Sequence, residues 1–105
     1  MAGLNYSQLN NRQCVGFEQL VVGVASTILA SIPATATGAI VQVESDVLGD
    51  KAVRYREDGT APTAAIGMFI ANAGAFDLTS KKSLKNFKVI QAVAGTTKLN
   101  ILYYK

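Results

Sequence analysis

The most constraining feature of this chain is a short alternating run that leads directly into a turn. Val53 and Tyr55 alternate with Arg54 and Arg56. This period of two is typical of a β-strand with one buried face and one face in water. The segment therefore predicts a strand, and the residues that follow specify where it ends.

The turn after this strand is set by residues with restricted or unusual backbone preferences. Asp58 can accept hydrogen bonds from nearby backbone amides, and Gly59 tolerates a positive φ angle. Pro62 fixes its own φ angle and keeps Ala61 extended, so a helix cannot continue through this point. We therefore expect an all-β protein with rigid corners.

The rest of the chain repeats this pattern of short apolar runs separated by Gly, Pro, Asn and Asp. The spacing predicts about eight short strands, roughly 8–12 residues apart, which is the signature of a sandwich or barrel. We expect a single small β-sandwich over residues 14–105, jelly-roll or immunoglobulin-like, with one helical turn that Ser80 could cap. The predicted strands are 17–24, 26–32, 39–44, 52–56, 66–70, 75–79, 86–93 and 97–104.

Composition supports one folded domain that gains stability from other subunits. Of the 105 residues, 50% are hydrophobic and only 16% are charged, which excludes a disordered chain. The apolar residues are mostly small, so a core built from them buries less surface per residue. We therefore expect a homo-oligomer, such as a trimer, or a place in a larger assembly.

Residues 1–13 are polar, rich in Asn and Gln, and aperiodic. They carry three spaced apolar residues, Leu4, Tyr6 and Leu9. One interpretation is a frayed terminus. The other is an arm that docks on a neighbouring subunit and uses these three side chains as anchors.

Arg54 and Arg56 share one face of their predicted strand. A guanidinium group binds carboxylates well, so this pair is a candidate contact for a partner subunit. The simpler interpretation is that they form the solvated face of the sheet, where ion pairs contribute little.

No catalytic site, metal site or cofactor is expected. The chain has one cysteine, Cys14, and no histidine that could activate it, so a Cys-His nucleophile is excluded. Calcium could bind a set of carboxylates near two successive strands, although turn formation and pairing with nearby cations explain them more simply. These carboxylates are Glu44, Asp46, Asp50, Glu57 and Asp58.

The net charge of +3 comes partly from a late cluster of lysines at positions 81, 82, 85 and 88. A nucleic-acid-binding protein would usually show an arginine-rich stripe with stacking aromatics, so we expect a solvated basic segment. An acidic partner surface stays open as an alternative. The apolar residues 20–32 are too few, and too often interrupted, for a membrane helix, so no membrane contact is expected.

Two resemblances extend this interpretation. The segment YREDGTAPT, Tyr55–Thr63, resembles a strand-turn motif of chitobiase-like, immunoglobulin-like modules. More widely, residues 17–105 resemble small virion proteins of tailed bacteriophages. Most of that resemblance lies in residues 53–67 and in the closing LNILYY, residues 99–104.

The wider resemblance implies a structural virion component made in the host cytoplasm and placed on the capsid surface. Its first form is a capsid decoration, or cement, protein that binds the major capsid protein or other virion subunits. The alternatives are a head-tail connector or tail-associated protein, and a β module that binds a glycan or receptor. The glycan alternative would need exposed aromatics, for which the candidates are Tyr55, Tyr103 and Tyr104.

Overall fold

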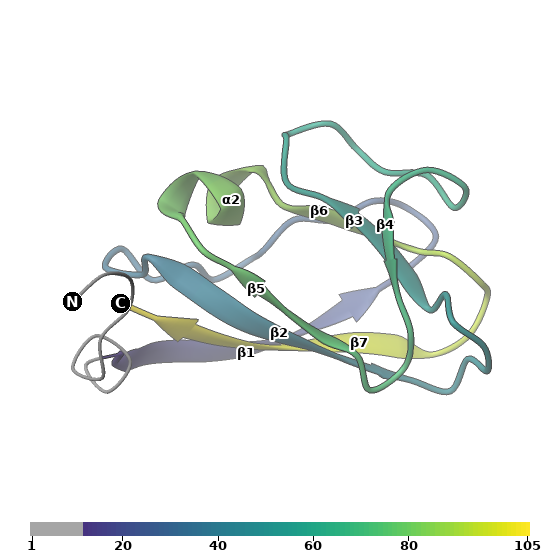
Figure 1. Cartoon of the computed structure of the whole chain (residues 1–105), viewed down its shortest axis with the longest axis horizontal. Helices are drawn as coiled ribbons and strands as arrows, with labels where there is room; N and C mark the ends of the chain where they lie inside the picture. Colours follow the sequence, from purple (N-terminus) through teal and green to yellow (C-terminus); the bar gives the residue numbers. More distant parts are fainter. Residues whose placement is uncertain (1–11) are drawn as a thin grey trace, which may run out of the picture.

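The protein is an all-β sandwich of two antiparallel sheets, seen in a computed structural model that describes residues 12–105 (Figure 1). The larger sheet has the strand order β1-β7-β2-β5, and the smaller sheet has the order β4-β3-β6. The elements are β1 (Cys14–Val22), β2 (Gly38–Ser45), β3 (Val53–Arg56), β4 (Met68–Ile70), β5 (Ala75–Leu78), α2 (Lys81–Asn86), β6 (Lys88–Gln91) and β7 (Thr97–Tyr104).

The large sheet is organised around β7, which pairs with β1 on one side and β2 on the other. Leu99, Ile101 and Tyr103 of β7 point into the sandwich and are fully buried. The outward residues of the same strand include Leu102, which is 38% exposed. Apolar residues on both faces of this segment favour a central strand or one covered by a partner, and β7 is central.

The small sheet has shorter strands and is joined to the large sheet by an aromatic cluster. The ring of Tyr55 on β3 stacks on that of Phe76 on β5, with centroids 4.2 Å apart. Phe87, just before β6, packs against both rings at 5.6 and 6.0 Å. Because these side chains come from both sheets, their contacts hold the two layers together.

The predicted helical turn is confirmed as α2, and Ser80 caps it. The Ser80 hydroxyl accepts a hydrogen bond from the Ser83 amide at 3.0 Å, which satisfies one free donor of the first turn. Leu84 anchors the helix in the core, while its lysines remain exposed. Over residues 12–105, no helix combines the length and apolar character needed to cross a membrane.

The predicted strand over residues 26–32 is wrong, so residues 12–105 form seven strands where about eight were expected. The segment makes only an isolated bridge, between Thr27 and Val89. Leu29 is buried among the core residues, and burial alternates from Ser26 to Ala30, but the alternation ends there because residues 30–32 are all exposed. The β-branched residues here therefore serve a connection that carries the chain from β1 to β2.

The turn after β3 follows the prediction. Gly59 has a φ angle of +86°, which is accessible to glycine without steric cost. The Asp58 carboxylate accepts a hydrogen bond from the Thr60 amide at 3.1 Å. At the other end of the domain, Gln13 and Lys105 exchange two backbone hydrogen bonds, so contact with the last strand begins at the last residue of the predicted arm.

Candidate partner-binding site

The outward face of the large sheet carries a row of apolar side chains across three strands. Phe17 on β1 lies opposite Leu102 on β7, and Leu102 lies opposite Ile40 on β2. Phe17 is 62% exposed and Leu102 is 38% exposed. We call these three residues the apolar row, and the exposure of Phe17 and Leu102 makes it a candidate contact surface.

A second row, next to the apolar row, consists of amide side chains. It comprises Gln19, Asn100 and Gln42, which face one another on the same three strands. Gln19 donates a hydrogen bond to the Asn100 side chain at 2.9 Å, and Asn100 donates to Glu44 at 3.1 Å. This amide row is thus partly ordered and retains exposed donors and acceptors.

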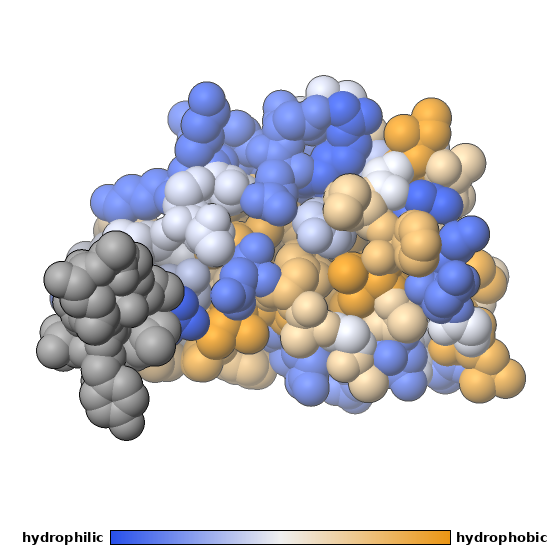
Figure 2. Space-filling view, viewed as in Figure 1, coloured by the Kyte–Doolittle hydropathy of each residue, from blue (hydrophilic) through white to orange (hydrophobic). Residues whose placement is uncertain are grey.

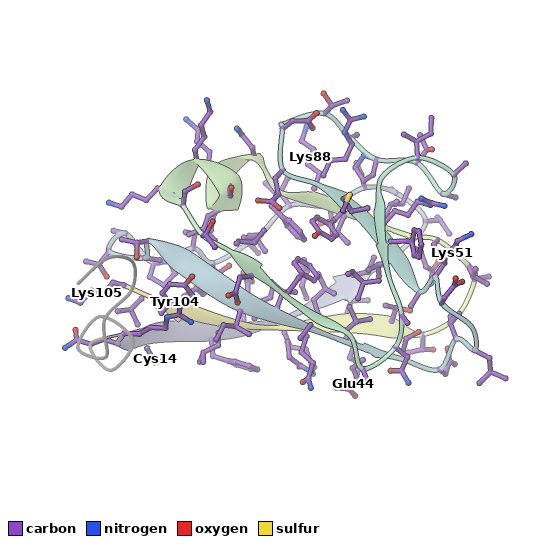
Figure 3. All side chains as sticks on the ribbon, in the orientation of Figure 1. Cys14, Glu44, Lys51, Lys88, Tyr104 and Lys105 are labelled. Atoms are coloured by element: carbon purple, nitrogen blue, oxygen red, sulfur yellow. The ribbon has the colours of Figure 1, made fainter. Side chains whose placement is uncertain are left out.

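A shallow groove of about 370 Å³ lies between the two rows. It is lined by Phe17, Ile40, Gln42, Ala75, Asn100 and Leu102. The groove lies on the outward face of the large sheet. In Figure 3 this is the side where Glu44 is labelled, below the large sheet and away from the small sheet. A surface with apolar anchors beside ordered amides can bury a partner's apolar side chain and hydrogen-bond its backbone.

The predicted contact residue Arg54 is engaged with its own chain. Its Nε donates to the Ala64 carbonyl oxygen at 3.1 Å, and its Nη1 donates to the Gly67 carbonyl oxygen at 2.7 Å. The guanidinium also lies 5.5 Å from the centre of the Phe69 ring. Arg54 therefore closes the loop between β3 and β4.

The second predicted contact residue, Arg56, forms an ion pair with Asp58 two positions later. Hydrogen bonding from Arg56, followed by that from the Thr60 amide, lowers the pKa of the Asp58 carboxyl below its ordinary value. The same hydrogen bond raises the pKa of Arg56. Both side chains are on the surface, so this pair organises the turn more than it stabilises the fold.

The other predicted contact residues, Leu4, Tyr6 and Leu9, lie outside the described residues. The nearest described residue of the predicted arm is Arg12, whose guanidinium lies 4.1 Å from the centre of the Tyr104 ring. This contact places Arg12, just before β1, beside the end of β7.

The carboxylates that could have bound calcium mostly have protein partners. Asp46 accepts a hydrogen bond from the Thr96 amide at 2.8 Å, and Glu44 and Asp58 are held as described above. No group of three or more His, Cys, Asp or Glu within residues 12–105 is placed to hold a metal ion. Turn formation therefore accounts for Asp46 and Asp58.

The tyrosines named for a glycan-binding surface are buried. Tyr55 is 7%, Tyr103 0% and Tyr104 9% exposed. Tyr103 donates its hydroxyl to the Glu18 carboxylate, and burial followed by that hydrogen bond raises the pKa of its phenol. Cys14, in contrast, is an exposed free thiol at the start of β1.

Sequence reasoning missed the apolar row as a surface. Its members come from positions 17, 40 and 102, and only the strand order and register bring them together. The signal in the sequence was Leu102, an apolar residue on the second face of the last strand, which fits a central strand as well as a strand covered by a partner and does not reveal its neighbours.

Comparison of the chain with protein-family models, with curated proteins and with solved structures finds no match.

Proposed function

We propose that this protein is a structural component of a tailed-phage virion and decorates the capsid by binding the major capsid protein. The observation that carries the proposal is the outward face of the large sheet, where the apolar row borders the amide row. The resemblance of residues 53–67 and 99–104 to small virion proteins supports the choice of another virion protein as the partner of this surface.

The character of this face supports protein-protein binding. Protein interfaces combine a desolvated apolar centre with hydrogen-bonding groups around it. Here Phe17 and Leu102 would supply the centre, while Gln19, Gln42 and Asn100 would supply the hydrogen bonds. A partner present in many copies would also stabilise the folded domain by mass action.

The first test is the copy number of the protein in purified particles from its source, measured by quantitative mass spectrometry against the most abundant protein. Decoration predicts a ratio near one to one or one to three. About a dozen copies per particle would indicate a symmetric ring at the head-tail junction instead. Absence from particles would reject the virion proposal.

A second test asks whether the apolar row makes the contact. Leu102→Glu places a charge in the row and should abolish rebinding to particles stripped of this protein. Leu48→Glu is the matched control, because Leu48 is 95% exposed and lies in the loop between β2 and β3. Equal binding by both variants would reject the apolar row as the docking surface.

A further inference from the structure

We infer that β1 is the pairing edge for a second copy of this chain, so that two large sheets join antiparallel into one continuous sheet. This inference goes beyond the virion proposal and does not depend on it. It begins from the backbone of β1, which is an outer strand of the large sheet. Within residues 12–105, β1 forms a ladder only with β7, and its opposite edge has no backbone partner.

The composition of this edge lacks most of the usual protections. Natural edge strands are commonly short, or carry lysine, proline or inward charges that prevent pairing with other chains. The sequence of β1, CVGFEQLVV, has no lysine and no proline. Glu18 is an inward charge of the protective kind, but hydrogen bonds from the Tyr103 hydroxyl and the Ser31 amide already satisfy it within its own chain.

The outward residues of β1 are complementary to a second copy of themselves. The outward face of β1 carries an amide, Gln19, between two apolar side chains, Phe17 and Val21. When two such strands pair antiparallel about Gln19, each Phe17 lies opposite the partner's Val21, and the two Gln19 side chains face each other. Phe17 is 62% and Val21 70% exposed, so both gain a cover by this pairing.

The regular part of the strand selects the same centre. A register shift separates Cys14 from Gly16, so uninterrupted pairing with β7 runs over residues 16–22. Gln19 is the middle residue of that span. A two-fold axis at Gln19 therefore lets the whole regular span pair with its copy, as an isologous dimer requires.

Neighbouring registers are worse. Pairing about Glu18 would place two carboxylates directly opposite each other, which is destabilising. Pairing about Leu20 would place Phe17 opposite Gly23, which lies beyond the end of β1. A shift of the register by one residue would place the inward-facing side chains of one β1 strand opposite the outward-facing side chains of the other. Pairing about Gln19 avoids all three, and it leaves Glu18 free to keep its intramolecular partners.

The pairing also extends the rows already present on the sheet. Asn100 already accepts a hydrogen bond from Gln19. The amide row would thus run from β2 through β7 and β1 into the same strands of the second copy. The charges do not oppose this, since no charged side chain of β1 lies on the outward face.

A site-specific cross-link tests the register in the full chain. Gln19→Cys, made in a Cys14→Ser background, places two thiols directly opposite each other. Antiparallel partners have Cα atoms about 4.5–5.5 Å apart, within the range of about 4.4–6.8 Å that a disulfide accepts. We expect mild oxidation to convert most of this variant to a covalent dimer, measured by non-reducing electrophoresis and intact mass.

Gln42→Cys in the same background is the matched control, because Gln42 lies on the same face but on β2. It should stay largely monomeric under identical oxidation. If Gln19→Cys cross-links no faster than Gln42→Cys, the proposed pairing is rejected.

Light scattering on the native chain gives a second measurement that needs no cysteine. We expect a dimer mass, with loss of the dimer in Val21→Lys and retention in Leu48→Lys. A monomer at all concentrations, or a trimer, would overturn the inference. These measurements use no phage particle, so their failure and that of the virion proposal are separately visible.

Discussion

The two sheets of this protein are held in different ways. Three strands of the large sheet are eight or nine residues long, and backbone pairing along both sides of β7 sets their order. The small sheet has strands of three or four residues and depends on side chains for its position. The aromatic cluster fixes its inner side, and Arg54 fixes the loop between two of its strands.

The surfaces of the two sheets differ accordingly. The outward face of the large sheet presents apolar and amide side chains, with Glu44 and Lys98 at one end. The outward face of the small sheet carries three cations, and Phe69 among them is 47% exposed. In Figure 2, hydrophilic residues lie over α2 and the near part of the loop after β3 along the top of the view, with a hydrophobic group at the upper right. Hydrophobic residues spread across the middle, and both kinds lie along the bottom. The difference between the sheets is therefore one of arrangement, because only the large sheet sets its outward apolar side chains in a row across three strands.

The largest effect should come from the aromatic cluster. Phe87→Ala should destabilise the protein by about 3–5 kcal/mol, because it removes a fully buried ring and leaves a cavity between the sheets. The measurement is urea unfolding of the purified protein. Phe87→Leu, which keeps most of the apolar volume, should lose much less, and equal losses would show that the small sheet does not depend on this packing.

The second largest loss of stability should come from the large sheet, at Gly38, where the backbone lies close to a side chain. A Cβ atom at Gly38 would lie 2.5 Å from the Tyr104 ring and 2.6 Å from the Leu78 carbonyl oxygen. Gly38→Ala should therefore cost about 1–3 kcal/mol in urea unfolding.

Gly23→Ala is the matched control for that substitution, since a Cβ atom there meets nothing within 4 Å. Its stability should stay within about 0.5 kcal/mol of the parent protein. Similar losses in both variants would remove the argument from close approach at Gly38.

Arg54 should matter less to global stability than to one loop. Arg54→Ala removes two hydrogen bonds to carbonyl oxygens and should cost about 1–2 kcal/mol. Hydrogen exchange should accelerate at the backbone amides of the loop after β3, while β7 keeps its protection. Arg54→Lys retains the charge without the guanidinium fork and should restore little of the protection. Unchanged exchange in Arg54→Ala would contradict the bracing role.

The smallest effect concerns Arg56 and Asp58. Because Arg56 lowers the pKa of the Asp58 carboxyl, Arg56→Gln should raise that pKa toward its ordinary value, measured by an NMR pH titration. The stabilising contribution of a carboxyl with a depressed folded pKa is present above its unfolded pKa, and it is lost as pH falls through the folded pKa. Both groups are exposed, so unfolding at neutral pH should hardly change. An unshifted Asp58 titration in Arg56→Gln would contradict the pairing.

The alternating segments were predictable because the order of apolar and polar residues within each one indicates which of its side chains are buried. Residues 39–44 and 52–56 alternate cleanly, and the structure places β2 and β3 there within one or two residues. Residues 26–32 have β-branched side chains but no neighbour that completes a ladder, which a local pattern cannot reveal. The expected two-layer β fold was therefore recoverable, while one connection was taken for a strand.

The candidate site was not predictable to the same degree. Phe17 and Leu102 become neighbours only through strand register, and no local signal encodes that pairing. Arg54 and Arg56 were recognised as sharing a strand face, but their partners at Gly67 and Asp58 depend on how the loop returns. Sequence periodicity shows which way a side chain points, and register decides what it meets.

The hydrogen bonds from Arg54 to two carbonyl oxygens have a consequence for which residues of this loop can be substituted. Every residue type supplies a carbonyl oxygen, so the exposed side chains at positions 60, 61, 64, 65 and 66 are free to change as long as the backbone path is kept. Pro62 is buried, and the Thr63 hydroxyl accepts hydrogen bonds from two amides of the loop, so these two positions are constrained. Gly67 is constrained as well, because side chains rarely adopt its φ angle of +140°, and a Cβ atom there would lie only 3.1 Å from Pro62 and 3.2 Å from Arg54. The loop thus combines a fixed frame with an adaptable outer surface, and natural divergence or peptide grafting has its most permissive position there.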